Sequence, residues 1–209
     1  MPRRAEIVDS VREKILQNEF GPGESVPEES LAAEFSVSRT PVREALIVLE
    51  HQGLVVNEAN RGVRVVSVSI ESIRSYFETA RATHPVMFGL VNSRISDADR
   101  KLLVSERPAT ANPTSSVLDH FRFLVRIAAL SRNDFMLITT RAIEAYHCFV
   151  RASVLRNLPE RVVGAACDEL RLHRENVVDA IMIGDDAELT EALSQMIEGS
   201  RVFLISHLV

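Results

Sequence analysis

The chain has 209 residues, of which 46% are hydrophobic and 5% aromatic, and its formal net charge is −5 at pH 7. This length allows one large or two small domains with hydrophobic cores, and the acidic balance argues against nonspecific nucleic-acid binding by the whole surface. Its two cysteines, Cys148 and Cys167, lack a paired spacing, which argues against a disulfide scaffold and fits a reducing compartment. No signal-peptide pattern or apolar run of about 18 residues occurs. We therefore expect a cytoplasmic protein with no membrane partner.

The first 66 residues predict a helix, a short helix, a turn, another helix and a hairpin. Apolar residues at helical spacing favour a helix over 6–18, and a stretch with two Gly and two Pro then breaks the chain. The short helix is expected over 28–35 and the next helix over 39–52, with Ser38 as its N-cap. Two short β-like runs follow, with Gly62 in the turn between them. This order is typical of a winged helix-turn-helix.

Beyond this segment the pattern predicts helices only. One long helix is expected over 69–94, where Pro85 should bend it or mark a join. Ser96 and Asp99 have nearly the spacing and chemistry of a capping box. A loop over 107–116 should precede the remaining helices, which we expect over 117–131, 134–156, 159–183 and 186–207.

The expected fold class is therefore mainly α, in two parts. A winged helix-turn-helix DNA-binding domain should occupy residues 1–66, and a linker should occupy 67–72. An all-α helical bundle should occupy 73–209.

The stretch "SRTPVREAL" has the chemistry to read DNA. Arg39 and Arg43 lie four residues apart near a helix N-terminus, where the helix dipole disfavours positive charge unless an anion compensates it. Arginine pairs with guanine in the major groove, and Ser38 and Thr40 can donate to phosphate. An ordinary surface helix is the alternative, because residues 1–66 carry eight basic and eleven acidic side chains. The predicted DNA-binding residues are Ser38, Arg39, Thr40, Arg43, Arg61 and Gly62.

The stretch "ILQNEFGPGESVPEESLAAEFSVSRTPVREALIVLEHQGLVVNEANRGVRV" resembles the winged helix-turn-helix of the GntR family of bacterial transcriptional regulators. The resemblance implies that Arg39, Thr40 and Arg43 contact bases and phosphates, and that Gly62 lets the wing approach the minor groove. Some members have a basic residue near the start of the short helix, where this chain has Glu28 and Glu29. A homodimer on a near-palindromic double-stranded DNA operator is expected.

The segments "ETARATHPV", "HFRFLVRIAALSRND" and "LRLHRENVVDAIMIGDDAELTEALSQM" resemble the FadR-type effector domain called FCD. That resemblance implies a helical bundle around a small-molecule effector, with a zinc-like metal held by one Asp and three His. The four ligand positions fall on His120, Leu124, His173 and Met196. We therefore expect the usual metal site to be lost, with His120 and His173 as a remnant. No cofactor is predicted with certainty, and the alternative is a divalent, zinc-like metal at a rearranged site among His84, His120, His147 and His173.

The effector is expected to be a carboxylate bound by Arg81, or an apolar molecule if the cavity lacks a metal. Each histidine could equally be an ordinary core or surface residue. The predicted effector-binding residues are Arg81, His84, His120, Leu124, His147, His173 and Met196.

The function expected from these patterns is a ligand-responsive transcriptional repressor that a small molecule releases from DNA. In one alternative the helical domain only dimerises. The other alternative is a metal-dependent enzyme, but the sequence shows no nucleophile–base pairing and no phosphate-binding loop, so we predict that the protein is not an enzyme.

Overall fold

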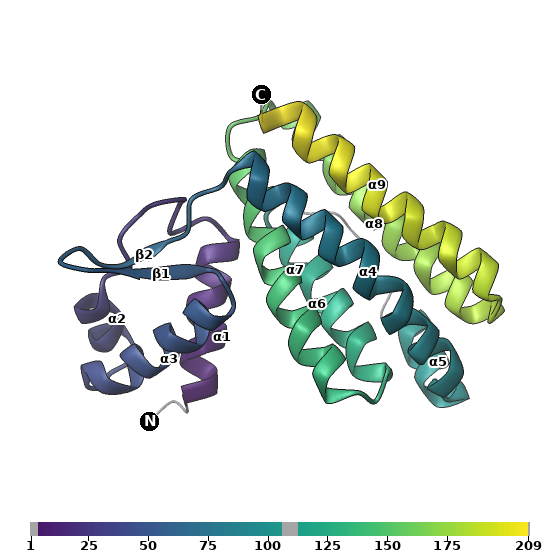
Figure 1. The fold of residues 1–209 in the computed structure, drawn as a ribbon, viewed down its shortest axis with the longest axis horizontal. Helices are drawn as coiled ribbons and strands as arrows, with labels where there is room; N and C mark the ends of the chain where they lie inside the picture. Colours follow the sequence, from purple (N-terminus) through teal and green to yellow (C-terminus); the bar gives the residue numbers. More distant parts are fainter. Residues whose placement is uncertain (1–3, 106–112, 209) are drawn as a thin grey trace.

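The computed structural model describes residues 4–105 and 113–208, and it shows a small N-terminal domain beside a larger helical domain (Figure 1). The loop predicted over 107–116 lies mostly outside the described residues. The N-terminal elements are α1 (Arg4–Leu16), α2 (Glu28–Glu34), α3 (Arg39–His51), β1 (Val55–Glu58) and β2 (Gly62–Val65). These elements have the predicted order of a winged helix-turn-helix.

The wing is an antiparallel hairpin. Val55 pairs with Val65 at its base and Glu58 with Gly62 near its tip. Asn60 and Gly62 have φ angles of 64° and 74°, a left-handed conformation that asparagine and glycine adopt more easily than other residues. The short connection therefore follows from turn chemistry visible in the sequence.

The helical domain consists of α4 (Ile70–Arg94), α5 (Asp97–Ser105), α6 (Pro113–Leu130), α7 (Asp134–Leu155), α8 (Glu160–Ile183) and α9 (Asp186–Leu208). The predicted mainly helical fold class is confirmed. Helix α4 continues through Pro85 as one element. Helix α6 begins four residues earlier than predicted, because proline is accepted in a first helical turn, where its missing N–H is not needed.

Local sequence signals fix several helix ends. Ser69 caps α4 in a reciprocal capping box with Ser72. Ser96 and Asp99 exchange the predicted backbone bonds at the start of α5. Gly184 ends α8 in the left-handed conformation with φ 77°. The connection between the domains is shorter than the predicted linker, since only residues 66–69 lie outside strand and helix.

The two domains share a continuous apolar core. Helix α1 packs against α3 on one side and against α6 and α7 on the other, so its buried residues belong to the same cluster as those of α7. Arg122 of α6 also donates to Glu13 of α1 at 2.6 Å. Among the described residues, every helix is too short or too polar to serve as a membrane span.

Candidate DNA-binding face and a buried polar cluster

Helix α3 presents the predicted DNA contacts on the side opposite its buried stripe. Arg39, Thr40 and Arg43 are exposed, and the helix turns its apolar side toward the domain core. The buried stripe consists of Val42, Ala45, Leu46 and Leu49. Ser38 occupies the N-cap position, as predicted, but its side chain makes no capping hydrogen bond. The segment "SRTPVREAL" therefore exposes its polar side chains together at one helix end.

Both arginines of α3 contact acids at the start of α2. Arg43 Nε donates to Glu28 Oε2 at 2.7 Å, and Arg39 donates to Glu29. The arginine side chains are 54% and 62% exposed for Arg39 and Arg43, so water screens both pairs and each adds little to stability. Glu28 and Glu29 thus pair with the two arginines that the sequence predicts to contact DNA.

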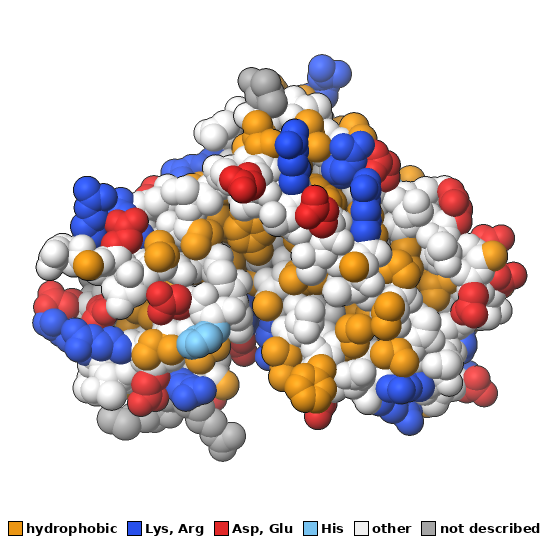
Figure 2. Space-filling view, viewed as in Figure 1, with side chains coloured by type: hydrophobic (Ala, Val, Ile, Leu, Met, Phe, Trp, Pro, Cys, Tyr) orange, Lys and Arg blue, Asp and Glu red, His pale blue; other side chains and the backbone are white. Residues whose placement is uncertain are grey.

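At the tip of the wing, an exposed arginine again lies next to an acidic side chain. Arg61 is 74% exposed and lies 3.7 Å from Glu58. No atom would lie within 4 Å of a Cβ added at Gly62, so glycine is required there by its positive φ and not by crowding. Figure 2 shows basic and acidic side chains next to one another on the N-terminal domain, instead of one uninterrupted basic surface.

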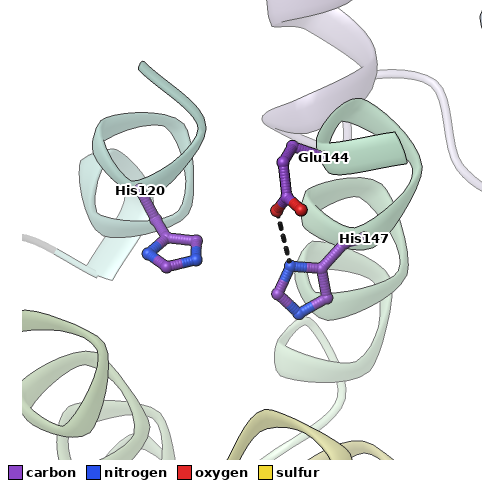
Figure 3. A group of neighbouring side chains, drawn as sticks. All are labelled: His120, Glu144 and His147. Atoms are coloured by element: carbon purple, nitrogen blue, oxygen red, sulfur yellow. Dashed lines mark hydrogen bonds and ion pairs between the residues drawn. The ribbon is translucent and has the colours of Figure 1, made fainter. Parts of the chain in front are cut away.

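A cluster of buried polar side chains lies in the core of the helical domain. Glu144 and His147 of α7 face His120 of α6 (Figure 3), and one ligand atom from each of the three lies within 4.8 Å of the other two. His84 of α4 approaches Glu144 Oε1 at 2.9 Å, and Tyr76 donates to the same oxygen at 3.1 Å. We call His84, His120, Glu144 and His147 the histidine–glutamate cluster.

Every side chain of the histidine–glutamate cluster is buried, with residue exposures of 0–2%. Burial favours the neutral form of Glu144, but hydrogen bonds from His147 and His84 outweigh it and hold the pKa of this carboxyl well below its usual value. Burial, and next the charge of His147, lower the pKa of His120. The cluster therefore combines a buried carboxylate with at least one neutral imidazole.

The cluster leaves polar atoms without hydrogen-bond partners. These atoms are His84 Nδ1, His120 Nδ1 and His147 Nε2, and the Nε atoms of the nearby buried Arg151 and Arg174 are also unpartnered. Buried polar groups are normally satisfied, because leaving one unpaired costs about 1–3 kcal/mol. A water molecule, an ion or a small polar molecule at this place would satisfy these atoms.

The structure places the other predicted effector residues elsewhere. Arg81 lies on the surface, 56% exposed, and pairs with Glu198 at 3.0 Å, so it does not point into the bundle as the resemblance implied. His173 lies 3.5 Å from Glu169 and is outside the histidine–glutamate cluster. Its side chain and that of Glu169 both approach Gly199 of α9.

Leu124 and Met196, at two of the family's metal-ligand positions, are buried in an apolar cluster with Met87 and Phe88. Neither side chain offers a nitrogen or carboxylate oxygen to an ion. The structure thus brings together three of the predicted histidines, His84, His120 and His147, whereas His173 lies beside Glu169.

Sequence reasoning missed Glu144, although a signal for it was present. The run "IEAYHCF" is apolar except for Glu144 and His147, which are spaced three residues apart. A Glu-x-x-His pair on one face of a bundle helix is a known arrangement of inward-pointing metal ligands. A charged residue within such a run marks a buried polar site.

Comparison with known proteins supports the N-terminal assignment. Residues 3–65 match the sequence model of the gntR family of bacterial regulatory proteins. The chain is 30% identical over 139 residues to the Nta operon transcriptional regulator of Aminobacter aminovorans, covering 63% of this chain and 65% of that protein. It is 34% identical over 74 residues to the transcriptional repressor RspR of Escherichia coli, covering 35% of this chain and 32% of RspR. The chain thus spans less than two thirds of the length of these curated relatives.

Two solved structures share the whole fold. A protein described as a GntR transcriptional regulator from Rhodococcus sp. RHA1 superimposes with a TM-score of 0.73 over 98% of both chains at 23% identity. The Escherichia coli protein McbR/YncC superimposes with a TM-score of 0.76 over 100% of both chains at 14% identity. At these identities the likeness establishes the fold alone. The curated relatives named above are described as transcriptional regulators.

Proposed function

We propose that the protein is a homodimeric transcriptional repressor released from its operator by a small molecule, and that residues 3–65, which match the gntR family model, are its DNA-binding domain. The observation that carries the DNA-binding half is the exposed end of α3, where Arg39, Thr40 and Arg43 stand clear of the domain core. A dimer would place two such helices in successive major grooves, so its operator would be a near-palindrome. Such a regulator acts in the cytoplasm, where bacterial DNA is located.

The effector half of the proposal rests on buried charge in the helical domain. Arg174 is buried and donates to the backbone carbonyl of Ser116 at 3.1 Å, and Arg151 is buried within the same core. Arg151 also lies 3.5 Å from Glu169, but the Nε atom of each guanidinium has no hydrogen-bond partner among the described residues, and such a buried N–H group favours an anionic ligand. We infer that this helical domain serves the role of the FadR-type effector domains and that a small carboxylate is its effector.

A physical route joins the effector region to the DNA-binding domain. We call the buried polar core around His120, Arg151 and Arg174 the effector region. The residues that follow His120 on α6 contact α1. The Arg12 guanidinium lies 5.7 Å from the centre of the Phe121 ring, and Arg122 pairs with Glu13. A shift of α6 on ligand binding would move α1 and, through it, α3. Such a shift changes operator affinity only if the ligand prefers one arrangement.

The DNA-binding half can be tested with a duplex selected by the wild-type protein from a random pool. Arg43→Ala should weaken binding by about 1–3 kcal/mol, roughly 5- to 150-fold, and relax the base preference. Arg171→Ala on α8 removes the same charge far from α3 and should leave affinity unchanged. Equal affinity of Arg43→Ala and wild type in a fluorescence-anisotropy titration would reject the assignment of α3.

The effector half needs a separate experiment. Small mono- and dicarboxylates are screened for a rise in melting temperature, which a ligand of the folded state must produce, and each hit is added to the protein–DNA complex. A hit that releases the duplex supports the proposal. If no acid raises the melting temperature and light scattering shows a dimer, the result supports the alternative function, in which the helical domain only dimerises.

A further inference from the structure

We propose that a groove between the two domains binds a phosphate monoester that carries an apolar group. Helix α1 forms one wall of the groove, and helices α6 and α7 form the other (Figure 1). The volume of the groove is about 330 Å³, within the range of about 300–1,000 Å³ that is usual for small-molecule sites. Four arginines from the three helices line it: Arg12, Arg122, Arg126 and Arg141.

The charges that line the groove do not balance. Asp9 and Glu13 are the acids in the lining, and each already contacts an arginine. Asp9 accepts from Arg12 Nη1, and Glu13 accepts from Arg122 Nη2 at 2.6 Å. Asp119, outside the lining, lies farther from Arg122, at 3.9 Å. The lining therefore carries two more positive than negative charges, which matches the charge of up to −2 on a phosphate monoester at neutral pH.

Arg141 is an arginine of the lining whose charge is not compensated. It is partly buried on α7 and makes no ion pair with any residue that the structure describes. Burial lowers the pKa of Arg12, the contact with Asp9 opposes this effect, and the positive charge of Arg141 lowers the pKa further. Arg12 and Arg141 therefore repel each other across the groove, because like charges at close range are unfavourable. A bound anion would replace this repulsion with an attraction to each arginine.

Arg12 offers a guanidinium group that is already fixed in place. Its side chain is only 5% exposed, and its Nε atom donates to Gln52 at 3.1 Å. Its Nη2 atom has no hydrogen-bond partner among the described residues, so this N–H group remains available for a phosphate oxygen. A planar guanidinium group held in this way suits phosphate and loses little freedom when it binds.

The remaining lining residues are apolar: Phe121, Val125, Ala129 and Leu137. The Arg12 guanidinium lies 5.7 Å from the centre of the Phe121 ring, so the charged and apolar parts of the lining meet. Inorganic phosphate would leave this apolar wall uncovered, whereas an attached aromatic or aliphatic group would remove it from water. The ligand that fits both parts is therefore a phosphate joined to an apolar group.

The groove is separate from the sites of the proposed function. It uses neither the arginines of α3 nor Arg151 and Arg174 of the effector region, so its failure and the failure of the proposed function are distinct results. A ligand in the groove would contact α1 and α7 together. It would therefore stabilise the present arrangement of the two domains relative to any other.

Phenyl phosphate is the probe for a test on the full-length protein. Isothermal titration calorimetry should show one site per chain, and the melting temperature should rise with the concentration of the probe. Phenol and inorganic phosphate each carry one half of the probe. Each should bind about 10-fold more weakly or less tightly still, because it meets only one part of the lining.

Matched variants locate the ligand. Arg141→Gln should weaken phenyl phosphate binding about 10- to 150-fold, because it removes hydrogen bonds between charged groups. Arg141→Lys keeps the charge but not the planar group, so its loss should be smaller. Arg156→Gln is the control, since Arg156 lies at the end of the same helix, outside the groove, and also lacks an ion pair among the described residues. It should bind like the wild type.

Circular dichroism checks that each variant folds. Arg141→Gln should fold, because it breaks no ion pair with a described residue. If it does not fold, Arg141→Lys decides the matter, and wild-type affinity in that variant would then count against the groove.

Three results would overturn the proposal. The folded wild type could fail to bind phenyl phosphate. Inorganic phosphate could bind as tightly as phenyl phosphate, which would show that the apolar wall takes no part. Folded Arg141→Gln could bind phenyl phosphate like the wild type, which would place the ligand elsewhere; if the same variant also lost affinity for the selected duplex, the groove would be a DNA contact instead.

Discussion

The acids at the start of α2 should limit the affinity of this protein for DNA. Glu28 contacts Arg43 and Glu29 contacts Arg39, so both arginines must exchange a carboxylate for a phosphate or base when they bind. We predict that Glu28→Gln together with Glu29→Gln tightens binding to the selected duplex. Glutamine keeps the size and hydrogen-bonding capacity of the side chain but removes its charge.

The magnitude follows from the exposure of the pairs. Exposed ion pairs are worth about 0.2–1 kcal/mol each, so two of them amount to about 0.4–2 kcal/mol. That energy corresponds to roughly 2- to 30-fold in the dissociation constant. The Glu28 side chain is 24% exposed and that of Glu29 is 71% exposed. Since water screens Glu28 less, Glu28→Gln should account for most of the effect.

Fluorescence anisotropy at several salt concentrations measures the change. Glu188→Gln with Glu191→Gln on α9 is the matched control, because it alters net charge equally at exposed positions far from α3. Adding Glu28→Gln to Arg43→Ala should have little further effect, since the acid acts through that arginine. Weaker binding by the Glu28 and Glu29 variant would refute this reasoning and show that the acids position the arginines for DNA.

Three further substitutions test the fold, each by chemical denaturation. Leu49→Ala should lower the free energy of unfolding by about 2–5 kcal/mol, because the side chain is fully buried; a loss below about 1 kcal/mol would contradict the packing described. Ser69→Ala should cost about 1 kcal/mol by removing the cap of α4, whereas Ser75→Ala in the exposed part of that helix should cost little. Gly184→Ala should destabilise by about 1–2 kcal/mol because φ is 77°, but Gly164→Ala, inside α8 with nothing within 4 Å of the added Cβ, should stabilise. The same sign for both glycine variants would contradict this explanation.

Local signals in the sequence determined most of the architecture. The apolar stripe of α3, the left-handed Gly62 and Gly184 and the caps at Ser69 and Ser96 depend on neighbours a few residues away. Such signals can be read from a pattern because backbone geometry and helix periodicity are local properties. The exposure of the arginines in "SRTPVREAL" could likewise be predicted from local helix periodicity.

Only the tertiary structure decided which polar residues meet. Glu144 lies 24 residues from His120 and 60 from His84 in the sequence, yet they share one buried cluster. Arg81 points toward solvent and pairs with Glu198 of α9. No local sequence pattern encodes that partner. Glu28 and Glu29 reach the arginines of α3 through the packing of α2 on α3. Contacts between helices depend on how whole elements pack. The periodicity of a single helix specifies which of its side chains are buried, but not which residues of other helices contact them.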